Sequence, residues 1–395
     1  MSGPLLVLVV SAEYPPRVGG VGDYTARLCA ALAPERVQAG VLTTGRSARP
    51  EMAEQPSNPC WVARAVPRWD FTAYAHVGAA VRAFRPHVVH VQYQAGAYQL
   101  HPAVNLLPLW LRARWWPARV GVTFHDLRPP YLFPKAGPLR GAIVRLMAAT
   151  SDGVVCTDAA DLRALGPGPG RRHIPLASNV DCATPPGYDQ RVWRAARGLP
   201  ADGPLVGFFG FMNRSKGVES LFGALARLPG VHLVLLGGES GPSDATDAAE
   251  AQRLRALEEA LGLGDRVWRS GLLAPADLSA ALLACDLIAL PFADGASGRR
   301  GSLLAALAHG RAIVTTRGPS SGLLEPGRDA ELVEAGDVEA LAEAIRTLLS
   351  DPARRARLER GARERAQGYT WPTVAQAHEQ WYWELVAGPP RARRR

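Results

Sequence analysis

The chain contains 395 residues, of which 47% are hydrophobic and 21% charged, and its formal net charge is +9. This length allows two domains with separate cores, and the composition is that of a globular protein. The basicity fits acidic ligands, an anionic membrane surface or nucleic acid, but no zinc-finger, RNP or helix-turn-helix pattern occurs, so no nucleic acid is expected.

Cysteine usage and the N-terminus bear on the cellular compartment. The five cysteines are scattered and form no CxxC, which favours buried free thiols in a reducing cytosol. The apolar run Leu5–Val10 is too short for a signal peptide and predicts a first strand. We expect a cytoplasmic protein, with peripheral contact at the inner face of the membrane left open. A helix predicted over 102–116 has an aromatic and arginine face, although we interpret it as a helix covering a sheet.

The first half of the chain alternates strand and helix patterns, as in a doubly wound parallel sheet. Strands are predicted at 5–11, 37–43, 61–66, 87–92, 119–124, 153–157 and 172–175, and helices at 23–32, 71–84, 102–116 and 141–149. A glycine-rich loop with Gly19 and Gly20 joins the first strand to the first helix, a place where such sheets receive phosphates. His125 follows the strand 119–124 and is expected at the ligand crevice, although a structural histidine is about as probable there.

A Pro- and Gly-containing segment, 181–203, predicts an interdomain linker between domains at 1–180 and 204–370. The second half repeats the pattern. Strands are predicted at 204–210, 231–236, 267–270, 287–290 and 312–314, and helices at 218–228, 245–261, 275–284, 302–309, 337–349, 352–366 and 371–385. The residues from 387 to 395 form a basic tail, interpreted as a solvated end.

Two loops of the second half gather cationic side chains before a helix. Arg214, Ser215 and Lys216 follow the strand 204–210, and Arg299 and Arg300 precede a helix for which Ser302 is the expected N-cap. A helix N-terminus beside such cations suits an anion such as a phosphate. Ordinary surface loops with solvated charges are an equally good interpretation of either loop by itself.

Two doubly wound halves normally face each other across a cleft, where a diphosphate-bearing ligand would lie. No DxD triplet occurs, and no His, Asp and Glu residues have metal-ligand spacing, so no metal or other cofactor is expected. The charge of a phosphate leaving group would then be neutralised by Arg214, Lys216, Arg299 or Arg300 and by helix N-termini.

Nearly the whole chain resembles the retaining glycosyltransferases of the GT-B fold, close to glycosyltransferase family 4. In the first half the resemblance is carried by SAEYPPRVGGVGDYTARLCAAL, VVHVQY, VTFHD and IPLASNV. In the second it is carried by GFFGFMNRSKGVESLFGAL, VHLVLLGG, WRSGLLAPADLSAALLACDLIALPF, LLAALAHGRAIVTT and AELVEAGDVEALAEAI. The resemblance implies metal-independent transfer of a sugar from a nucleotide diphosphate sugar, with retention, to an acceptor that is a glycan, a lipid-linked molecule or a small molecule.

The resemblance also implies residue roles. Gly19 and Gly20 would lie against the donor diphosphate, His125 would contact the donor sugar and assist catalysis, and Arg214 and Lys216 would neutralise the departing diphosphate. The helix at 371–386 would cross back to complete the first domain. Further donor contacts are expected from Asn213, Gly238, Gly271, Asp294, Ser297, Arg299, Arg300, Gly301 and Ser302.

The chain departs from the family in its Glu-x7-Glu motif, whose two positions fall on Ser297 and Ala305. Neither side chain can supply the carboxylates that contact the donor sugar and the ribose, although Asp294 is a candidate replacement for the first. Two alternatives to an active transferase therefore stand: a non-catalytic GT-B-like protein that binds a nucleotide or a partner, and a GT-B enzyme such as a nucleotide-sugar epimerase.

Overall fold

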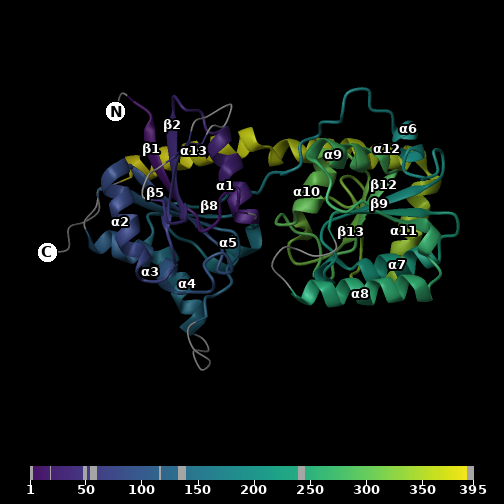
Figure 1. The fold of residues 1–395 in the computed structure, drawn as a ribbon, viewed down its shortest axis with the longest axis horizontal. Helices are drawn as coiled ribbons and strands as arrows, with labels where there is room; N and C mark the ends of the chain where they lie inside the picture. Colours follow the sequence, from purple (N-terminus) through teal and green to yellow (C-terminus); the bar gives the residue numbers. More distant parts are fainter. Residues whose placement is uncertain are drawn as a thin grey trace. The chain divides into compact units, whose positions relative to one another are not determined.

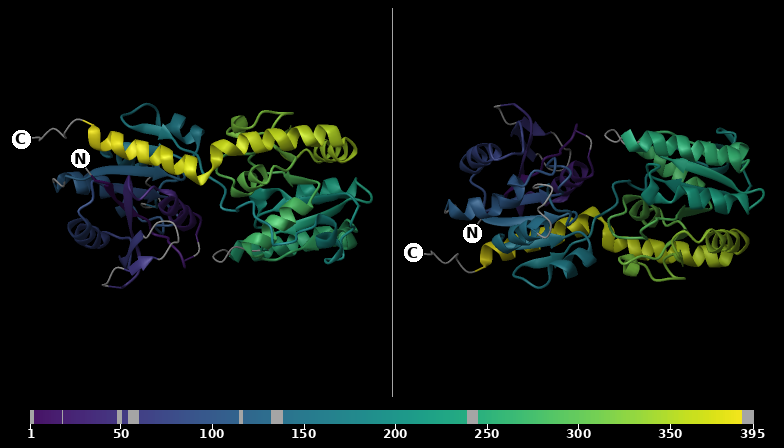
Figure 2. Two further views of the ribbon diagram at one scale, coloured as in Figure 1. Left: turned by 90° about the horizontal axis from the view of Figure 1, so that it is seen from above. Right: turned by 90° about the horizontal axis from the view of Figure 1, so that it is seen from below.

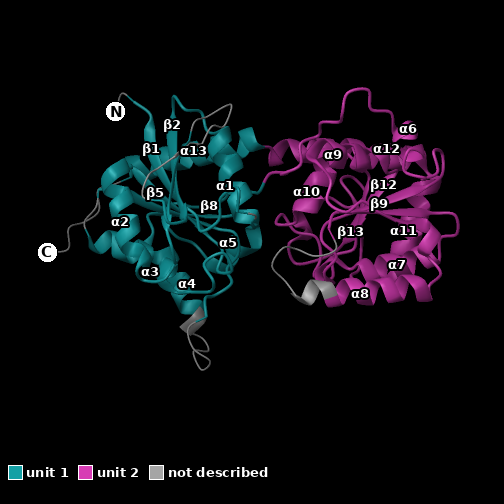
Figure 3. Ribbon diagram, in the orientation of Figure 1, with its two compact units in different colours: residues 1–176, 371–395 teal, residues 177–370 magenta. Residues whose placement is uncertain are grey.

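The structure is a computed structural model, and it describes residues 3–17, 19–47, 51–53, 60–114, 117–131, 139–238 and 245–388. The chain forms two compact units (Figure 3). Unit 1 comprises residues 1–176 and 371–395, and unit 2 comprises residues 177–370. Most of the predicted basic tail lies outside the described residues.

Unit 1 is built on an eight-stranded sheet in the order β3-β4-β2-β1-β5-β6-β7-β8 (Figure 1). All neighbouring strands are parallel except β3 and β4, which are antiparallel. The strands are β1 (Leu5–Val10), β2 (Val37–Thr44), β3 (Glu51–Ala53), β4 (Cys60–Val66), β5 (Val88–Tyr93), β6 (Arg119–Phe124), β7 (Gly153–Cys156) and β8 (Arg171–His173). The helices are α1 (Gly20–Ala31), α2 (Ala73–Phe84), α3 (Ala103–Ala113), α4 (Leu139–Thr150), α5 (Ala159–Leu165) and α13 (Trp371–Ala387).

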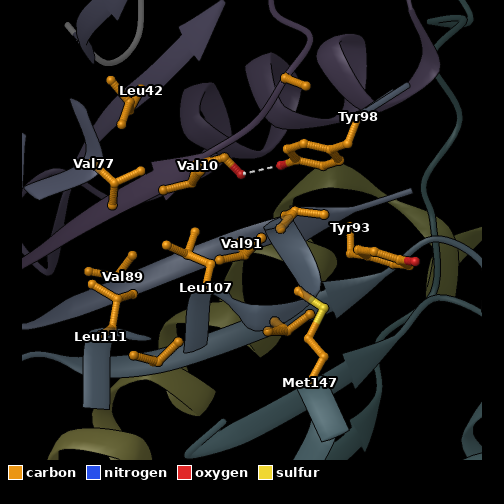
Figure 4. Packing of buried hydrophobic residues seen from close by; sticks show 14 of the residues in the cluster. Val10, Leu42, Val77, Val89, Val91, Tyr93, Tyr98, Leu107, Leu111 and Met147 are labelled. Carbon is orange, nitrogen blue, oxygen red and sulfur yellow. Dashed lines mark hydrogen bonds between the residues drawn. The ribbon is translucent and has the colours of Figure 1, made fainter. Parts of the chain in front are cut away.

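The two faces of the unit 1 sheet are different in character. Alternate residues of β5, including Val89 and Val91, belong to an apolar core with residues of α2, α3 and α4 (Figure 4). The residues between them, His90 and Gln92, are also fully buried but point to the opposite face, where His90 meets Tyr382 of α13. One face of the sheet is therefore hydrophobic, and the other encloses polar side chains.

Helix α13 lies along that polar face and also contacts α1 (Figure 2). Its Trp381 is fully buried, and its indole N–H donates to the carbonyl of Gly170 at 3.0 Å. Two glycines make this approach possible, because a Cβ at Gly121 of β6 would meet the Trp381 ring and one at Gly153 of β7 would meet Leu385 and Trp381. The C-terminal helix is thus an integral part of unit 1.

Unit 2 has a six-stranded, fully parallel sheet in the order β11-β10-β9-β12-β13-β14. The strands are β9 (Leu205–Phe209), β10 (His232–Leu236), β11 (Val267–Arg269), β12 (Leu287–Leu290), β13 (Ile313–Thr316) and β14 (Glu331–Val333). The helices are α6 (Gln190–Ala195), α7 (Val218–Ala226), α8 (Ala245–Ala260), α9 (Pro275–Ala284), α10 (Gly301–Ala308), α11 (Val338–Ser350) and α12 (Pro352–Ala366), with short 3-10 turns at Arg214–Lys216, Gly264–Arg266, Ser321–Leu323 and Gln367–Tyr369.

The segment 181–203 is part of unit 2 and carries helix α6. Asp189 caps this helix by accepting the N–H of Val192, and α6 lies against α9. Arg194 is buried and donates through Nε to the carbonyl of Ala284 at 2.8 Å. The Pro and Gly content that predicts a linker here reflects turns on either side of a short packed helix.

Candidate functional site

The strand order reverses at one point in each sheet, between β1 and β5 in unit 1 and between β9 and β12 in unit 2. Loops that leave the carboxyl ends of the strands beside such a point diverge to opposite faces and leave a crevice for a ligand. His125, Gly19 and Gly20 follow strands near the unit 1 reversal. Lys216 and Arg300 follow the two strands at the unit 2 reversal.

In unit 1, the N-terminus of α1 is occupied by a carboxylate of the chain itself. A Cβ at Gly19 would collide with the carboxyl group of Glu13, so the glycine leaves space for this side chain. Hydrogen bonds from the backbone of Gly22 and Val21 lower the pKa of Glu13, but burial outweighs them and raises it. The carboxyl group of Glu13 therefore lies at the start of α1 next to Gly19, where the donor diphosphate was expected, and the contact of Gly19 and Gly20 with a diphosphate stays a prediction.

His125 follows β6 directly and lies among neutral polar groups. Its Nε2–H donates to Oε1 of Gln92 at 2.8 Å, and its ring meets the Tyr24 ring edge-on at a centroid distance of 4.8 Å. Burial, with a smaller contribution from His378, lowers the pKa of His125 to about 3. The imidazole is therefore uncharged near neutral pH.

The polar face behind His125 contains two more histidines. His90 makes hydrogen bonds to the hydroxyls of Tyr382 at 2.8 Å and Thr123 at 2.7 Å. Nδ1–H of His378 donates to the carbonyl of Val374 at 2.9 Å. Burial lowers the pKa of His90 well below its usual value and that of His378 to about 4, so both rings are neutral as well.

Unit 2 presents the opposite electrostatics. Nζ of Lys216 and the guanidinium carbon of Arg300 lie 5.2 and 4.7 Å from the centroid of the same Phe292 ring. Burial and, to a smaller extent, the nearby Arg300 lower the pKa of Lys216 to about 8, while Asp294 acts in the opposite direction. Two cations thus make cation–π contacts with the same ring at a partly buried site. An anionic ligand would stabilise this arrangement.

The loops after β9 and β12 are held in direct contact. Gly217 has a positive φ of 69°, and a Cβ there would collide with the carbonyl oxygen of Pro291. The N–H of Ala293 donates to the carbonyl of Ser215 at 3.0 Å. This close approach, which only glycine allows, brings Lys216 to Phe292 and Arg300.

The remaining predicted residues of the β12–α10 loop fall into two groups. Asp294 forms an ion pair with Arg300. Nη1 of Arg300 also lies 3.5 Å from the hydroxyl of Ser215. That hydroxyl donates to Oδ1 of Asn213 at 2.8 Å. Ser297 is buried and its carbonyl accepts the N–H of Arg300 at 3.1 Å, whereas Arg299 is exposed. Asp294, Arg300, Asn213 and Lys216 thus form one cluster.

The prediction that Ser302 caps α10 is wrong. The N-cap is Arg300 and the helix begins at Gly301, so Ser302 lies inside the first turn, 5% exposed. Its hydroxyl oxygen is buried and makes no hydrogen bond to any residue that the structure describes. The first turn of α10 therefore holds this hydroxyl two residues after Arg300 of the cation cluster, at a helix start.

Arg214 does not join the cluster. Its side chain is 83% exposed, and Nε lies 3.4 Å from Oε2 of Glu250 on α8. Gly238 and Gly271 follow β10 and β11, and an isolated bridge links Gly237 to Gly271. These two strand ends lie on the β10 side of β9, beside the Arg214 turn and away from the loop of β12.

Ala305 is fully buried and so presents no group to a ligand. Its carbonyl accepts Nδ1–H of His309 at 2.8 Å, and Nε2 of His309 meets the hydroxyl of Ser279 at 2.9 Å. In the described part of the chain, no group of three or more His, Cys, Asp or Glu residues is placed to hold a metal ion.

Sequence reasoning missed three residues that shape these sites: Glu13, Gln92 and Phe292. Glu13 and Phe292 each lie two or more residues beyond a strand end, where no periodicity applies. Gln92 had a detectable signal, since it lies two residues after His90 in a buried strand and must share its face.

Two units, each with a doubly wound parallel sheet, are the architecture of the GT-B glycosyltransferases. Solved structures support the fold: sucrose-phosphate synthase from Thermosynechococcus elongatus superposes with a TM-score of 0.76 at 23% identity, covering 97% of this chain and 99% of that one. HepE from Anabaena, solved with UDP-glucose, gives a TM-score of 0.71 at 19% identity, covering 97% and 100%.

Sequence comparisons identify the family. Residues 203–351 match the model of glycosyl transferases group 1, and residues 19–177 match that of the glycosyl transferase 4-like domain. A D-inositol 3-phosphate glycosyltransferase from Xylanimonas cellulosilytica is 32% identical over 287 residues, 68% of this chain and 67% of that protein. The lipopolysaccharide core biosynthesis glycosyltransferase LpsE from Rhizobium meliloti is 32% identical over 223 residues, 56% of this chain and 59% of that protein. The chain belongs to the glycosyl transferases group 1 family, which confirms the predicted resemblance.

Proposed function

We propose that this glycosyltransferase transfers a sugar from a nucleotide diphosphate sugar, with retention at the anomeric carbon and without a metal ion. The observation that carries the proposal is the pairing of Lys216 and Arg300 over Phe292, beside the first turn of α10 and the unused hydroxyl of Ser302. Charge grows on the diphosphate as its bond to the sugar breaks, so preorganised cations and N–H groups stabilise the transition state more than the ground state.

The family resemblance implies that His125 contacts the donor sugar, and we include this role in the proposal. Its imidazole is neutral, so it would act through a hydrogen bond to a sugar hydroxyl and not as a cation. Retention rests on the family resemblance. The names of the two relatives suggest the acceptors to try first, an inositol phosphate and a lipopolysaccharide core.

Membrane contact stays a prediction. No helix in the described ranges is long and apolar enough to span a membrane. On α3, Val104, Leu107 and Leu111 are buried, as expected of a helix that covers a sheet, while Leu109 and Arg112 are exposed. Trp115 and Trp116 lie outside the described residues.

The proposal is tested by incubating the protein with UDP-, GDP- and ADP-sugars and following release of the nucleoside diphosphate, with and without EDTA. We expect one donor class to be consumed in the presence of an acceptor, with no effect of EDTA and with NMR showing retained anomeric configuration. Loss of turnover with EDTA, restored by Mg²⁺, would contradict the metal-independent mechanism.

Three other outcomes separate the alternatives. Nucleotide binding without turnover on any acceptor favours the non-catalytic protein. An epimerised free sugar nucleotide favours the epimerase. Failure of every donor to bind overturns the proposal.

A further inference from the structure

The hydrogen bond between His125 and Gln92 fixes where the proton of a neutral imidazole lies. The partner atom on Gln92 is the amide oxygen, which only accepts hydrogen bonds. Nε2 of His125 must therefore carry the proton, and the lone pair that remains for a ligand is on Nδ1. The tautomer of His125 therefore depends on the orientation of the Gln92 amide, whose oxygen accepts hydrogen bonds and whose NH₂ group donates them.

The orientation of Gln92 is set by His90 on the same strand face. Gln92 is fully buried, and its Nε2 lies 3.5 Å from both ring nitrogens of His90. His90 is neutral, and both of its ring nitrogens already have hydroxyl partners, Tyr382 and Thr123. If the Gln92 amide were flipped, its oxygen would face the His90 ring. The single N–H of that ring already donates to a hydroxyl, so the oxygen would find no donor there. The observed orientation is therefore the favourable one.

Among the described residues, the side chains in contact with His125 are uncharged. Tyr24 comes from α1, His378 from α13, and Gln92 and His90 from β5. Asp126, the next residue in the chain, accepts the backbone N–H of Arg128 at 3.1 Å. With these neighbours the imidazole stays neutral, so its tautomer decides whether it accepts or donates a hydrogen bond at a ligand.

We propose that Gln92 is the positioning residue for His125: it accepts Nε2–H and leaves Nδ1 as an acceptor for a hydroxyl of the bound sugar. The effect on turnover rests on the proposed function, whereas the tautomer does not. Gln92 acts through His125 and touches no ligand itself, and the chain of contacts behind it ends on α13 at Tyr382.

The tautomer can be read directly by NMR of the full-length protein labelled with ¹⁵N-histidine, because the two ring nitrogens differ in chemical shift when only one is protonated. The chain has nine histidines, and the His125→Asn variant identifies the resonance of interest. Two variants then change the partner: Gln92→Met removes the acceptor at similar volume, and Gln92→Glu keeps an acceptor but adds charge. Gln94→Met is the matched control, a half-buried glutamine two residues along whose side chain has no part in this network.

We expect the wild type and Gln94→Met to show the Nε2–H tautomer of His125. Gln92→Met should show a mixture of the two tautomers. Gln92→Glu should keep Nε2–H, while the pKa of His125 rises by about 1–3 pH units. In the donor assay, Gln92→Met should lower kcat more than it raises KM, and Gln92→Glu should partly restore kcat with an acid limb moved to higher pH. An Nδ1–H tautomer in the wild-type protein overturns the proposal, and so does an unchanged tautomer in a folded Gln92→Met variant. Because the spectra need no turnover, an inactive protein with the expected tautomers would count against the proposed function alone.

Discussion

Both units have loops at a reversal of the strand order, but the side chains in these loops are neutral at His125 in unit 1 and cationic in unit 2. In unit 1 the helix start at Gly19 and Gly20 is occupied by the carboxylate of Glu13, and His125 is neutral. In unit 2 the helix that starts at Gly301 follows Arg300, which lies with Lys216 over the Phe292 ring and is paired with Asp294. One parallel-sheet architecture therefore supports a neutral hydrogen-bonding site and a cationic site.

The difference shows that the fold sets where a site lies, whereas the residues at the strand ends set its chemistry. The parallel sheet decides that the loops after β1, β5, β9 and β12 lie at a crevice, and any sequence with this topology would do the same. The residue types at the strand ends decide the charge. In unit 1 the cost of a desolvated cation is avoided by keeping imidazoles neutral. In unit 2 the cations remain desolvated, which leaves stabilisation to be gained when an anion binds.

The largest expected effect is the unfolding of unit 1 at acid pH. His90, His125 and His378 have pKa values below that of an unfolded histidine, about 4 for His378, so between pH 6.5 and 4 the unfolded chain binds protons that the folded protein does not. Stability is then fully present above about pH 6.5 and falls as the pH drops towards 4. Hydrogen exchange from pH 7 to pH 4.5 should show β5, β6 and α13 losing protection before β9 and β12.

The variant His378→Gln sharpens this test, because it removes one titrating group and keeps a polar side chain next to Tyr24. Its loss of protection should be shallower than that of the wild type over the same pH range. Earlier exchange in unit 2, or equal protection of unit 1 at pH 7 and 4.5, would show that the neutral histidines do not set acid stability.

Removal of the Lys216 cation should have the next largest effect. Lys216→Ala removes one preorganised group from the proposed diphosphate site, so kcat/KM should fall by about 2–4 kcal/mol in transition-state stabilisation. Arg227→Ala is the matched control, since it removes one exposed positive charge from the other end of α7. A wild-type kcat/KM in Lys216→Ala would remove Lys216 from the site.

The pH dependence gives the same residue a second test. Because the pKa of Lys216 is lowered to about 8, the free enzyme loses this charge as the pH rises through 8, and kcat/KM should decline there. Lys216→Arg remains charged, so its profile should lack that alkaline limb. An alkaline limb that persists in Lys216→Arg would assign the titration to another group.

Strand positions were predictable because buried parallel strands are short apolar runs: Arg119–Phe124 and Leu287–Leu290 were predicted with the bounds observed. The three-residue strands β3 and β14 and the short helix α5 were missed, since so few residues show no periodicity. Ser302 illustrates the limit at the site. A serine before an apolar run predicts an N-cap, but the N-cap is Arg300, two residues earlier. Likewise, no local pattern shows that Lys216 and Arg300 would share the ring of Phe292.

The smallest effect concerns Arg214, which the sequence groups with Lys216 but the structure pairs with Glu250. Only Arg214 is exposed, at 83% against 9% for Glu250, and their contact is long at 3.4 Å, so a bound diphosphate can compete for Arg214. If it does, Glu250→Gln should tighten donor binding by up to about fivefold, Arg214→Ala should weaken it, and the double variant should match Arg214→Ala. Calorimetric titration with the nucleoside diphosphate measures all three. Glu219→Gln is the control, because it removes the other partner of Arg253 without touching Arg214. Equal affinities for wild type and Arg214→Ala would mean that Arg214 stays on Glu250 throughout, leaving Lys216 and Arg300 as the diphosphate cations.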